Sequence, residues 1–232
     1  MSELSNPVQN VTFASNGDEA YGYLTLPASG NGPGLIVIQE WWGLTTHMAQ
    51  VADRLAGEGY VALAPDLYGG ATTHDEGEAL QLLLELPVDR AARDLGGAVD
   101  YLISRDEVVG ETVGVVGFCM GGAFALQLAV QEGSRVAAAA AFYPTGYLPD
   151  DYAGLQAPVL IHIADGDEIN TPTLAEELNE KISVATRTKP EIDHYPAGHA
   201  FLNEEDLLGT FDAEQATIAW DRTVAFLRSH LG

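Results

Sequence analysis

The sequence predicts an α/β protein with a mostly parallel central sheet of about eight strands, covered by helices on both faces. Short apolar runs rich in β-branched residues alternate along the chain with longer amphipathic stretches. Most of these runs are apolar throughout, which is typical of strands buried on both faces of a parallel sheet. With 232 residues, the chain is expected to form a single domain over residues 1–232.

Eight segments are the expected strands. The first two are edge strands joined by Asn16-Gly17-Asp18, a turn signal. The fourth is expected to end at Pro65, because proline donates no backbone hydrogen bond. The expected strands are residues 11–13, 21–26, 35–39, 61–64, 113–118, 136–142, 159–164 and 192–195.

Six amphipathic segments are the expected helices. Gly57 and Gly59 are expected to end the first of them. Thr173 and Glu176 form a capping-box signature directly after Pro172, which predicts the start of the fifth. The expected helices are residues 48–56, 75–86, 89–104, 121–131, 173–183 and 214–228.

Composition narrows the classes of partner and the compartment. The chain has 34 acidic residues against 10 lysines and arginines, a formal net charge of −24, so its field repels nucleic acid and anionic membranes. The acidic surface is interpreted as a means of solubility, with adaptation to high salt as the alternative. One cysteine excludes an internal disulfide, and neither a secretory signal nor a membrane-spanning run is evident. We therefore expect a cytoplasmic protein.

Residues 113–122 carry the strongest chemical signal. An apolar strand leads directly into a G-x-C-x-G-G motif and then into an alanine-rich helix. This is the nucleophile elbow, G-x-S-x-G, with Cys119 in the nucleophile's place. Small residues at Gly117 and Gly121 let the backbone close around a strained turn, and the helix N-terminus favours a thiolate. The alternatives are a buried structural thiol and a dinucleotide loop, which would require glycine at position 119.

An elbow nucleophile requires an acid and then a histidine further along the chain. The strand at residues 159–164 leads into Asp165 and Asp167, at a strand end where ligand crevices form, and either carboxylate can orient a histidine. His199 stands in a small-residue loop after the last expected strand, where its imidazole can reach the elbow.

The other histidines lack this context. His162 lies within a buried strand and is expected to be a packed core residue, and neither His74 nor His194 stands in a comparable loop. No two histidines have the spacing of metal ligands, so neither a metal nor another cofactor is expected.

Residues 40–43, Glu40-Trp41-Trp42-Gly43, follow the third expected strand. In an elbow-type site the loop after this strand supplies one backbone N–H of the oxyanion hole, and the residue after the nucleophile supplies the other. Trp41 and Met120 are the expected donors. Glu40, among apolar residues and tryptophans, is expected to be desolvated and able to exchange a proton, with a solvated loop carboxylate as the alternative.

Four motifs together resemble the dienelactone hydrolase family of the α/β-hydrolase superfamily. They are Val-Ile-Gln-Glu at 37–40, Gly-Tyr-Val-Ala-Leu-Ala-Pro-Asp-Leu-Tyr at 59–68, Gly-Phe-Cys-Met-Gly-Gly at 117–122 and Tyr-Pro-Ala-Gly-His-Ala-Phe at 195–201. The resemblance covers residues from roughly 10 to 230 and implies an α/β-hydrolase fold with the triad Cys119, Asp167 and His199.

The resemblance also assigns two roles that the local pattern leaves open. It chooses Asp167 because the family's acid lies a short loop before a proline such as Pro172. It further implies that Glu40 manages the proton of Cys119, so that the thiolate forms only when substrate displaces the carboxylate.

The sequence departs from the family where substrate is bound. Family members that bind the dienelactone carboxylate use two arginines, whereas residues 72–86 here contain no basic residue except His74, and Asn203 occupies the second position. A neutral ester or lactone is therefore the expected small-molecule substrate, and the chain is expected to be a monomer or small homo-oligomer. The candidate pocket residues are Trp41, Trp42, Tyr68, Tyr143, Phe201 and Asn203, and a place in the core is the alternative for each of the aromatic residues.

The expected reaction is two-step acyl transfer through a thioester on Cys119. The main alternative is a non-catalytic ligand-binding or thiol-sensing protein on the same scaffold. Among enzymes, a general carboxylesterase or a peptidase is the alternative.

Overall fold

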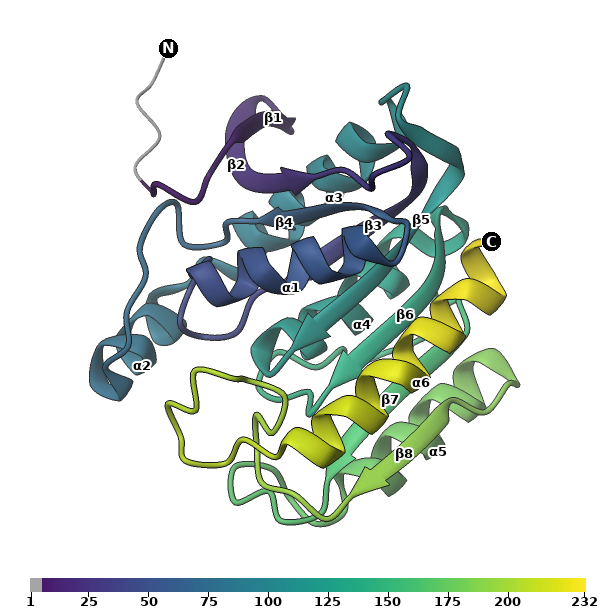
Figure 1. Cartoon of the computed structure of the whole chain (residues 1–232). Coiled ribbons are helices and arrows are strands. Elements are labelled where there is room, and N and C mark those ends of the chain that lie inside the picture. The colour runs from purple at the N-terminus through teal and green to yellow at the C-terminus, as the bar shows by residue number, and fades with distance from the viewer. Residues whose placement is uncertain (1–5) are drawn as a thin grey trace. The chain divides into compact units, whose positions relative to one another are not determined.

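An eight-stranded sheet organises the chain in this computed structural model, which describes residues 6–232. The chain divides into two compact units, Met1–Gly114 and Val115–Gly232, and strand β5 (Val108–Phe118) runs from one unit into the other. The strand order is β1-β2-β4-β3-β5 in the first unit and β5-β6-β7-β8 in the second (Figure 1). The predicted α/β class and α/β-hydrolase fold are confirmed, whereas the single-domain organisation stays a prediction.

The strands of the first unit form as their sequence patterns predict. β1 (Val11–Ser15) and β2 (Asp18–Thr25) pair antiparallel across a turn in which Asn16 and Gly17 have φ angles of 46° and 98°. β2 pairs antiparallel with β4 (Val61–Pro65), and β4 pairs parallel with β3 (Gly32–Ile38). In this unit the antiparallel pairings therefore lie at the edge formed by β1 and β2, and the parallel pairing joins β3 and β4.

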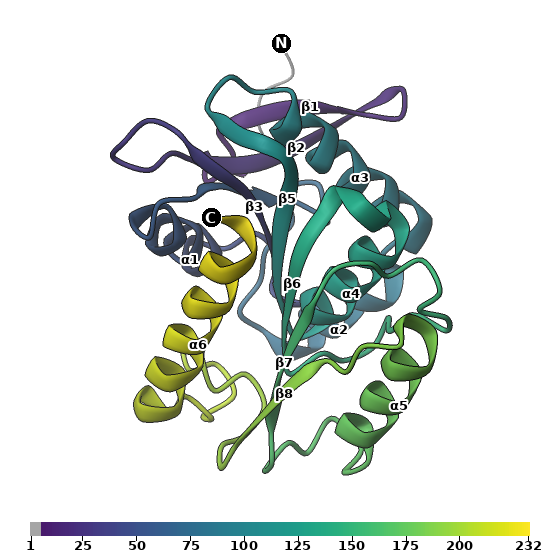
Figure 2. The ribbon, with the colours of Figure 1, turned by 90° about the vertical axis from the view of Figure 1, so that its right-hand side faces the viewer.

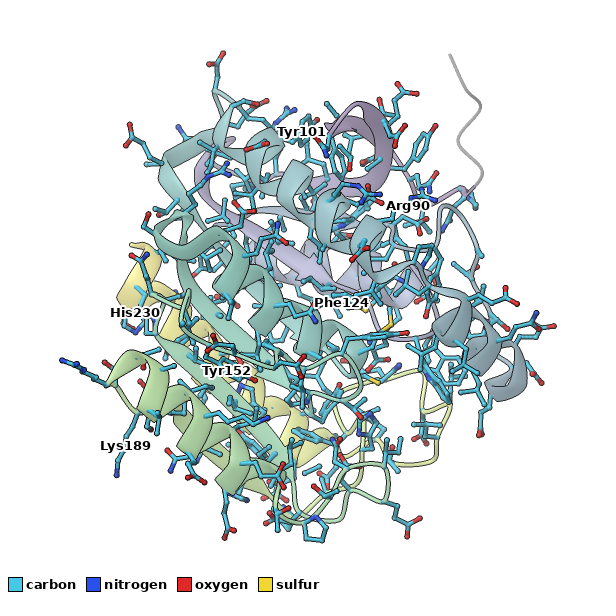
Figure 3. All side chains as sticks on the ribbon, turned by 180° about the vertical axis from the view of Figure 1, so that it is seen from behind. Arg90, Tyr101, Phe124, Tyr152, Lys189 and His230 are labelled. Carbon is cyan, nitrogen blue, oxygen red and sulfur yellow. The ribbon has the colours of Figure 1, made fainter. Side chains whose placement is uncertain are left out.

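Helices cover both faces of this first unit. α1 (Thr46–Gly57) packs on β4 and β2, and α3 (Val88–Ile103) packs on β1 and β4; Figure 2 shows them on opposite sides of these strands. α2 (Glu76–Glu85) begins at Asp75, whose side chain accepts a hydrogen bond from the backbone of Glu78. On α3, Tyr101 (labelled in Figure 3) stacks on Phe13 of β1, with ring centroids 5.5 Å apart.

The second unit brings the chemical loops to one end of its strands. β6 (Val136–Phe142), β7 (Val159–Ala164) and β8 (Glu191–Tyr195) are parallel, so the loops that follow them leave from the same edge. α4 (Met120–Glu132) and α5 (Leu174–Thr186) lie on one face and α6 (Ala213–Leu231) on the other (Figure 2). A short 3₁₀ turn, Gly133–Arg135, connects α4 to β6.

Two details differ from the sequence predictions. β5 begins at Val108 rather than at residue 113, because its exposed first half contains Gly110 and Glu111 and lacks an apolar pattern. The capping box at Thr173 is wrong: the backbone there is helical (φ −92°, ψ −3°), and the hydroxyl donates to the Glu177 carboxylate, 2.6 Å away.

The cap of α6 was not predicted from the sequence. Asp212 precedes α6, and its side chain accepts hydrogen bonds from the backbone of Glu214 and Gln215, at 3.1 and 3.0 Å. None of the helices within residues 6–232 is long and apolar enough to cross a membrane.

Candidate active site

Cys119 lies at a strained turn between β5 and α4. Its φ of 57° and ψ of −120° are rare for any residue except glycine. A Cβ atom on Gly117 would lie 1.9 Å from the carbonyl oxygen of Gly121, and one on Gly122 would lie 2.8 Å from that of Phe142. The turn therefore requires glycine at positions 117 and 122, while Gly121 contributes the carbonyl that crowds Gly117.

Hydrogen bonds on both sides hold this turn. The Cys119 N–H donates to the Phe142 carbonyl at the end of β6, 3.0 Å away. The Cys119 carbonyl accepts from the N–H groups of Gly122 and Thr145, at 3.0 and 3.2 Å. The elbow is thus fastened to α4 and to the loop after β6, and the Cys119 side chain is buried, with 7% of its surface exposed.

His199 and Asp167 form a buried pair in the same unit. His199 Nδ1 lies 2.7 Å from Asp167 Oδ2, and their side chains are only 4% and 7% exposed. The Asp167 carboxylate also accepts from the Ile169 and Asn170 backbone N–H groups and from the Asn170 side chain, at 2.8, 3.1 and 3.0 Å. Burial alone would raise the pKa of Asp167, but these hydrogen bonds and the imidazole lower it overall.

The pKa of His199 is raised by the two side chains beside its imidazole. Burial by itself would lower the pKa of His199, but the hydrogen bond that its Nδ1–H donates to Asp167 and the neighbouring Cys119 side chain raise it to about 10. His199 Nε2 is buried, and the Cys119 side chain lies close enough to the imidazole to raise its pKa. An imidazole with this pKa carries a proton at neutral pH.

The structure separates the two candidate acids. Asp165 pairs with His194, with its Oδ1 atom 2.7 Å from Nδ1, and both side chains are about half exposed. Asp167 alone of the two contacts His199. The resemblance chose Asp167, and the geometry supports that choice; its catalytic role stays a prediction.

His162 is confirmed as a packed core residue. Its side chain has no exposed surface, and its two ring nitrogens lie 2.8 Å from the Tyr195 and Thr223 hydroxyls. Burial lowers the pKa of His162 to about 3, so the ring is neutral at neutral pH. His74 is exposed, as a histidine without a site would be.

Aromatic rings surround the buried imidazole. The ring of Tyr143 lies 5.1 Å from that of His199 and 5.5 Å from that of Phe201. Tyr143 has a φ of 37°, a strained conformation for a bulky residue. Tyr143 and Phe201 are 1% and 0% exposed, so they support the imidazole from inside the core, and a contact with substrate stays a prediction.

Asn203 has a local structural partner. It is 3% exposed, and its Oδ1 atom accepts from the Glu205 backbone N–H, 2.9 Å away. Two donors to Asp167, the Asn170 side chain and the Ile169 N–H, were not anticipated from sequence. An asparagine shortly after the acid was the available signal, since such side chains commonly bond within turns.

The candidates in the first unit lie at the end of β3. Glu40 is 3% exposed, so the predicted burial of its carboxylate is confirmed and the solvated alternative is wrong. Trp42 is 2% exposed, and its ring centroid lies 4.9 Å from that of the partly exposed Trp41. Gly43 closes the turn with a φ of 92°, and a Cβ atom there would lie 2.4 Å from the Ala71 carbonyl.

The remaining predicted residues have clear local positions. Met120 directly follows Cys119 as the first residue of α4. Tyr68 is half-buried, and its backbone N–H donates to Asp66 Oδ1, 3.0 Å away. The roles of Glu40, Trp41, Met120 and Tyr68 stay predictions. Within residues 6–232, histidine, cysteine and carboxylate side chains form no group of three that could hold a metal ion.

Comparisons with known proteins show which proteins the chain is similar to. The model of the dienelactone hydrolase family matches residues 20–231. A candidate carboxymethylenebutenolidase from Aquifex aeolicus is 31% identical over 96% of this chain and 99% of its own. The carboxymethylenebutenolidase of Pseudomonas sp. (strain P51) is 29% identical over 93% of this chain and 92% of its own.

Solved structures give the same picture. The crystal structure of a candidate dienelactone hydrolase from Klebsiella pneumoniae matches with a TM-score of 0.84 and 27% identity. The match covers 95% of this chain and 97% of that one. The similarity in sequence and in fold therefore extends over nearly the whole chain.

Proposed function

Because the chain belongs to the dienelactone hydrolase family, we propose that it hydrolyses neutral carboxylic esters or lactones through Cys119, His199 and Asp167. The enzyme class, a hydrolase of esters or lactones, is that of the family and of its carboxymethylenebutenolidase relatives. One observation carries the residue assignment: a buried imidazole, paired with a buried carboxylate, has its free nitrogen and its raised pKa coupled to the only thiol in the chain.

The first step is the attack of the thiolate on the carbonyl carbon. The Cys119 sulfur forms a bond to this carbon, and the carbonyl electron pair moves to oxygen. The tetrahedral intermediate collapses, the bond to the alcohol oxygen breaks, and the proton on His199 Nε2 passes to the departing alkoxide. The products are an alcohol, or the opened end of a lactone, and a thioester on Cys119.

The second step regenerates the thiolate. Neutral His199 accepts a proton from water as the hydroxide oxygen bonds to the thioester carbon. Collapse of this intermediate breaks the carbon–sulfur bond and releases the carboxylic acid, which loses its proton to solvent. Asp167 holds the imidazole in the orientation required in both steps and stabilises its charged form.

Further residues complete the proposal from the resemblance to the family. The backbone N–H groups of Trp41 and Met120 are the proposed oxyanion donors, and Glu40 is the proposed partner for the proton of the resting thiol. The proposed pocket residues remain Trp42, Tyr68, Tyr143, Phe201 and Asn203.

Charge supports a neutral substrate. A protein with a formal net charge of −24 repels an approaching carboxylate. Asn203 carries no charge and is occupied by the Glu205 backbone, and the segment 72–86 contains no lysine or arginine. An anionic lactone would find no cation at either of these places.

The test is the hydrolysis of p-nitrophenyl acetate by wild type and by Cys119→Ala, followed by a panel of neutral and anionic esters and lactones. We expect Cys119→Ala to lose turnover by about 10⁴-fold or more while it keeps the wild-type circular dichroism spectrum. Mass spectrometry of the acid-quenched wild type should show one acyl group on Cys119. Full activity in Cys119→Ala contradicts the proposal, and reversible oxidation of Cys119 without turnover favours the thiol-sensing alternative.

A further inference from the structure

The loop that carries His199 is closed at its base by a threonine. This loop follows β8 and leads to α6 (Figure 1). The Thr210 hydroxyl donates a hydrogen bond to the backbone carbonyl of His199. We propose that Thr210 is a positioning residue that fixes the backbone of His199 and thereby aims its imidazole at Cys119. This inference rests on the proposed function.

A second hydrogen bond beside the first makes this closure rigid. The Asp212 backbone N–H donates to the Phe201 carbonyl, 3.0 Å away, so residues 210–212 run alongside residues 199–201. Asp212 also caps α6 through its side chain. The backbone of His199 is therefore linked through Thr210 to the first turn of a 19-residue helix that packs on β6 and β7.

The methyl group of Thr210 packs against Gly198, in addition to the hydrogen bond that the hydroxyl donates. A Cβ atom on Gly198 would lie 2.8 Å from Thr210 Cγ2 and 3.1 Å from Thr210 Cβ. Thr210 thus packs directly against the residue before the histidine while it bonds to the histidine itself. Glycine at 198 leaves room for this contact, and neither serine nor valine at 210 would reproduce both halves of it.

The backbone after His199 requires such support. Ala200 has a φ of 61°, in the left-handed region that non-glycine residues adopt only when the surroundings hold them there. Its carbonyl accepts from the Asn203 N–H, 2.9 Å away, which fixes the far side of the turn. The near side depends on Thr210.

Three points then define the position of the imidazole. Asp167 holds Nδ1, and the Tyr143 ring packs against the imidazole with an angle of 59° between the ring planes. Thr210 holds the backbone from which the imidazole extends. Loss of the third point leaves the ring bound to Asp167 but free to shift relative to Cys119. A displacement of about 1 Å of a reacting group can reduce turnover by about 100-fold.

The experiment compares Thr210→Val, Thr210→Ser and Thr217→Val in ester hydrolysis. Valine keeps the shape of threonine without its hydroxyl, serine keeps the hydroxyl, and Thr217 is an exposed matched control whose hydroxyl donates to the Ala213 carbonyl of α6 at 2.8 Å. We expect Thr210→Val to lower kcat by about 10-fold to 100-fold with little change in KM. The kcat of Thr210→Ser should stay within about threefold of that of wild type, and the kcat of Thr217→Val should equal that of wild type.

A double variant tests the contact with Gly198. Gly198→Ala should lower kcat because its new methyl group meets Thr210 Cγ2. Thr210→Ser removes that atom, so Gly198→Ala/Thr210→Ser should be more active than Gly198→Ala alone. Two independent effects would instead multiply, which would overturn the proposed contact.

A readout without turnover separates this proposal from the proposed function. The rate of Cys119 alkylation by iodoacetamide across pH reports how far His199 stabilises the thiolate. Thr210→Val should shift this profile to higher pH, while Thr210→Ser and Thr217→Val follow wild type. If wild type hydrolyses no ester, the proposed function fails and the alkylation shift still tests Thr210. An unchanged profile and unchanged kcat in Thr210→Val would overturn the positioning role.

Discussion

Two Asp–His pairs start from the same turn, yet only one is buried. Asp165 with His194 and Asp167 with His199 have the same oxygen-to-nitrogen distance, 2.7 Å, and the two carboxylates are separated by Gly166 alone. The first pair is about half exposed, whereas the second is 4% and 7% exposed. Distance alone therefore does not distinguish a surface contact from a candidate catalytic one.

The difference lies in the surroundings. Water screens the exposed pair, and such contacts contribute about 0–1 kcal/mol to stability. The buried pair is screened far less, so each neighbouring charge changes its protonation more strongly. Three further hydrogen bonds fix the Asp167 carboxylate, and a thiol adjoins its histidine. Burial and the additional donors thus give the second pair the surroundings that the proposed proton transfer requires.

The largest expected effect is on kcat, in variants that break one Asp–His pair at a time. Asp167→Asn should lower kcat by about 10²-fold to 10⁴-fold, because an amide cannot stabilise the charged imidazole. Asp165→Asn is the matched control and should change kcat by less than about threefold. Steady-state kinetics with p-nitrophenyl acetate measures both. Equal losses in the two variants would show that the buried pair has no special role.

A smaller effect is expected on the imidazole itself. The pKa of His199, raised to about 10, depends partly on Cys119. In Cys119→Ala the neighbouring sulfur is gone, so the pKa of His199 should fall toward its usual range. NMR titration of the imidazole protons measures it, with the resonances of His194 as the internal reference. A pKa of His199 that stays near 10 in this variant would assign the shift to Asp167 alone.

The smallest effect is on stability at alkaline pH. Because the pKa of His199 is raised in the folded state, its contribution to stability is fully present below the unfolded-state pKa and is lost as pH rises through about 10. Between neutral pH and about pH 11, the free energy of unfolding of wild type should fall by on the order of 1 kcal/mol or more beyond any fall in His199→Gln. Urea unfolding at the two pH values measures this difference. Parallel losses in both proteins would contradict it.

Much of the fold was predictable from the sequence because its strands are strongly apolar. β6 and β7 have the predicted bounds, and the resemblance to the family, drawn from four motifs, is confirmed by the family model. The first half of β5 was missed because exposure removes the apolar pattern that marks a strand. The failed cap at Thr173 shows that a motif of four letters does not determine backbone angles.

The site was predictable only in part. The elbow around Cys119 has a local pattern, since crowding requires glycines at fixed positions. The local residues alone left Asp165 and Asp167 open, and only the resemblance to the family chose Asp167; in the structure the two differ in which histidine each one reaches. Thr210 acts on His199 across a loop, and its effect depends on the loop's closure in space. Contacts of this kind are visible only in the folded structure.

Two requirements conflict at position 119: the backbone conformation favours glycine, whereas the proposed chemistry needs cysteine. Glycine adopts a φ of 57° without a steric penalty, so glycine at 119 would relieve the backbone strain of the folded chain. The proposed chemistry requires a sulfur there. A search for substitutions that relieve backbone strain would thus favour a replacement that removes the proposed nucleophile, so a thermostable version that keeps the proposed activity has to keep cysteine at this strained position.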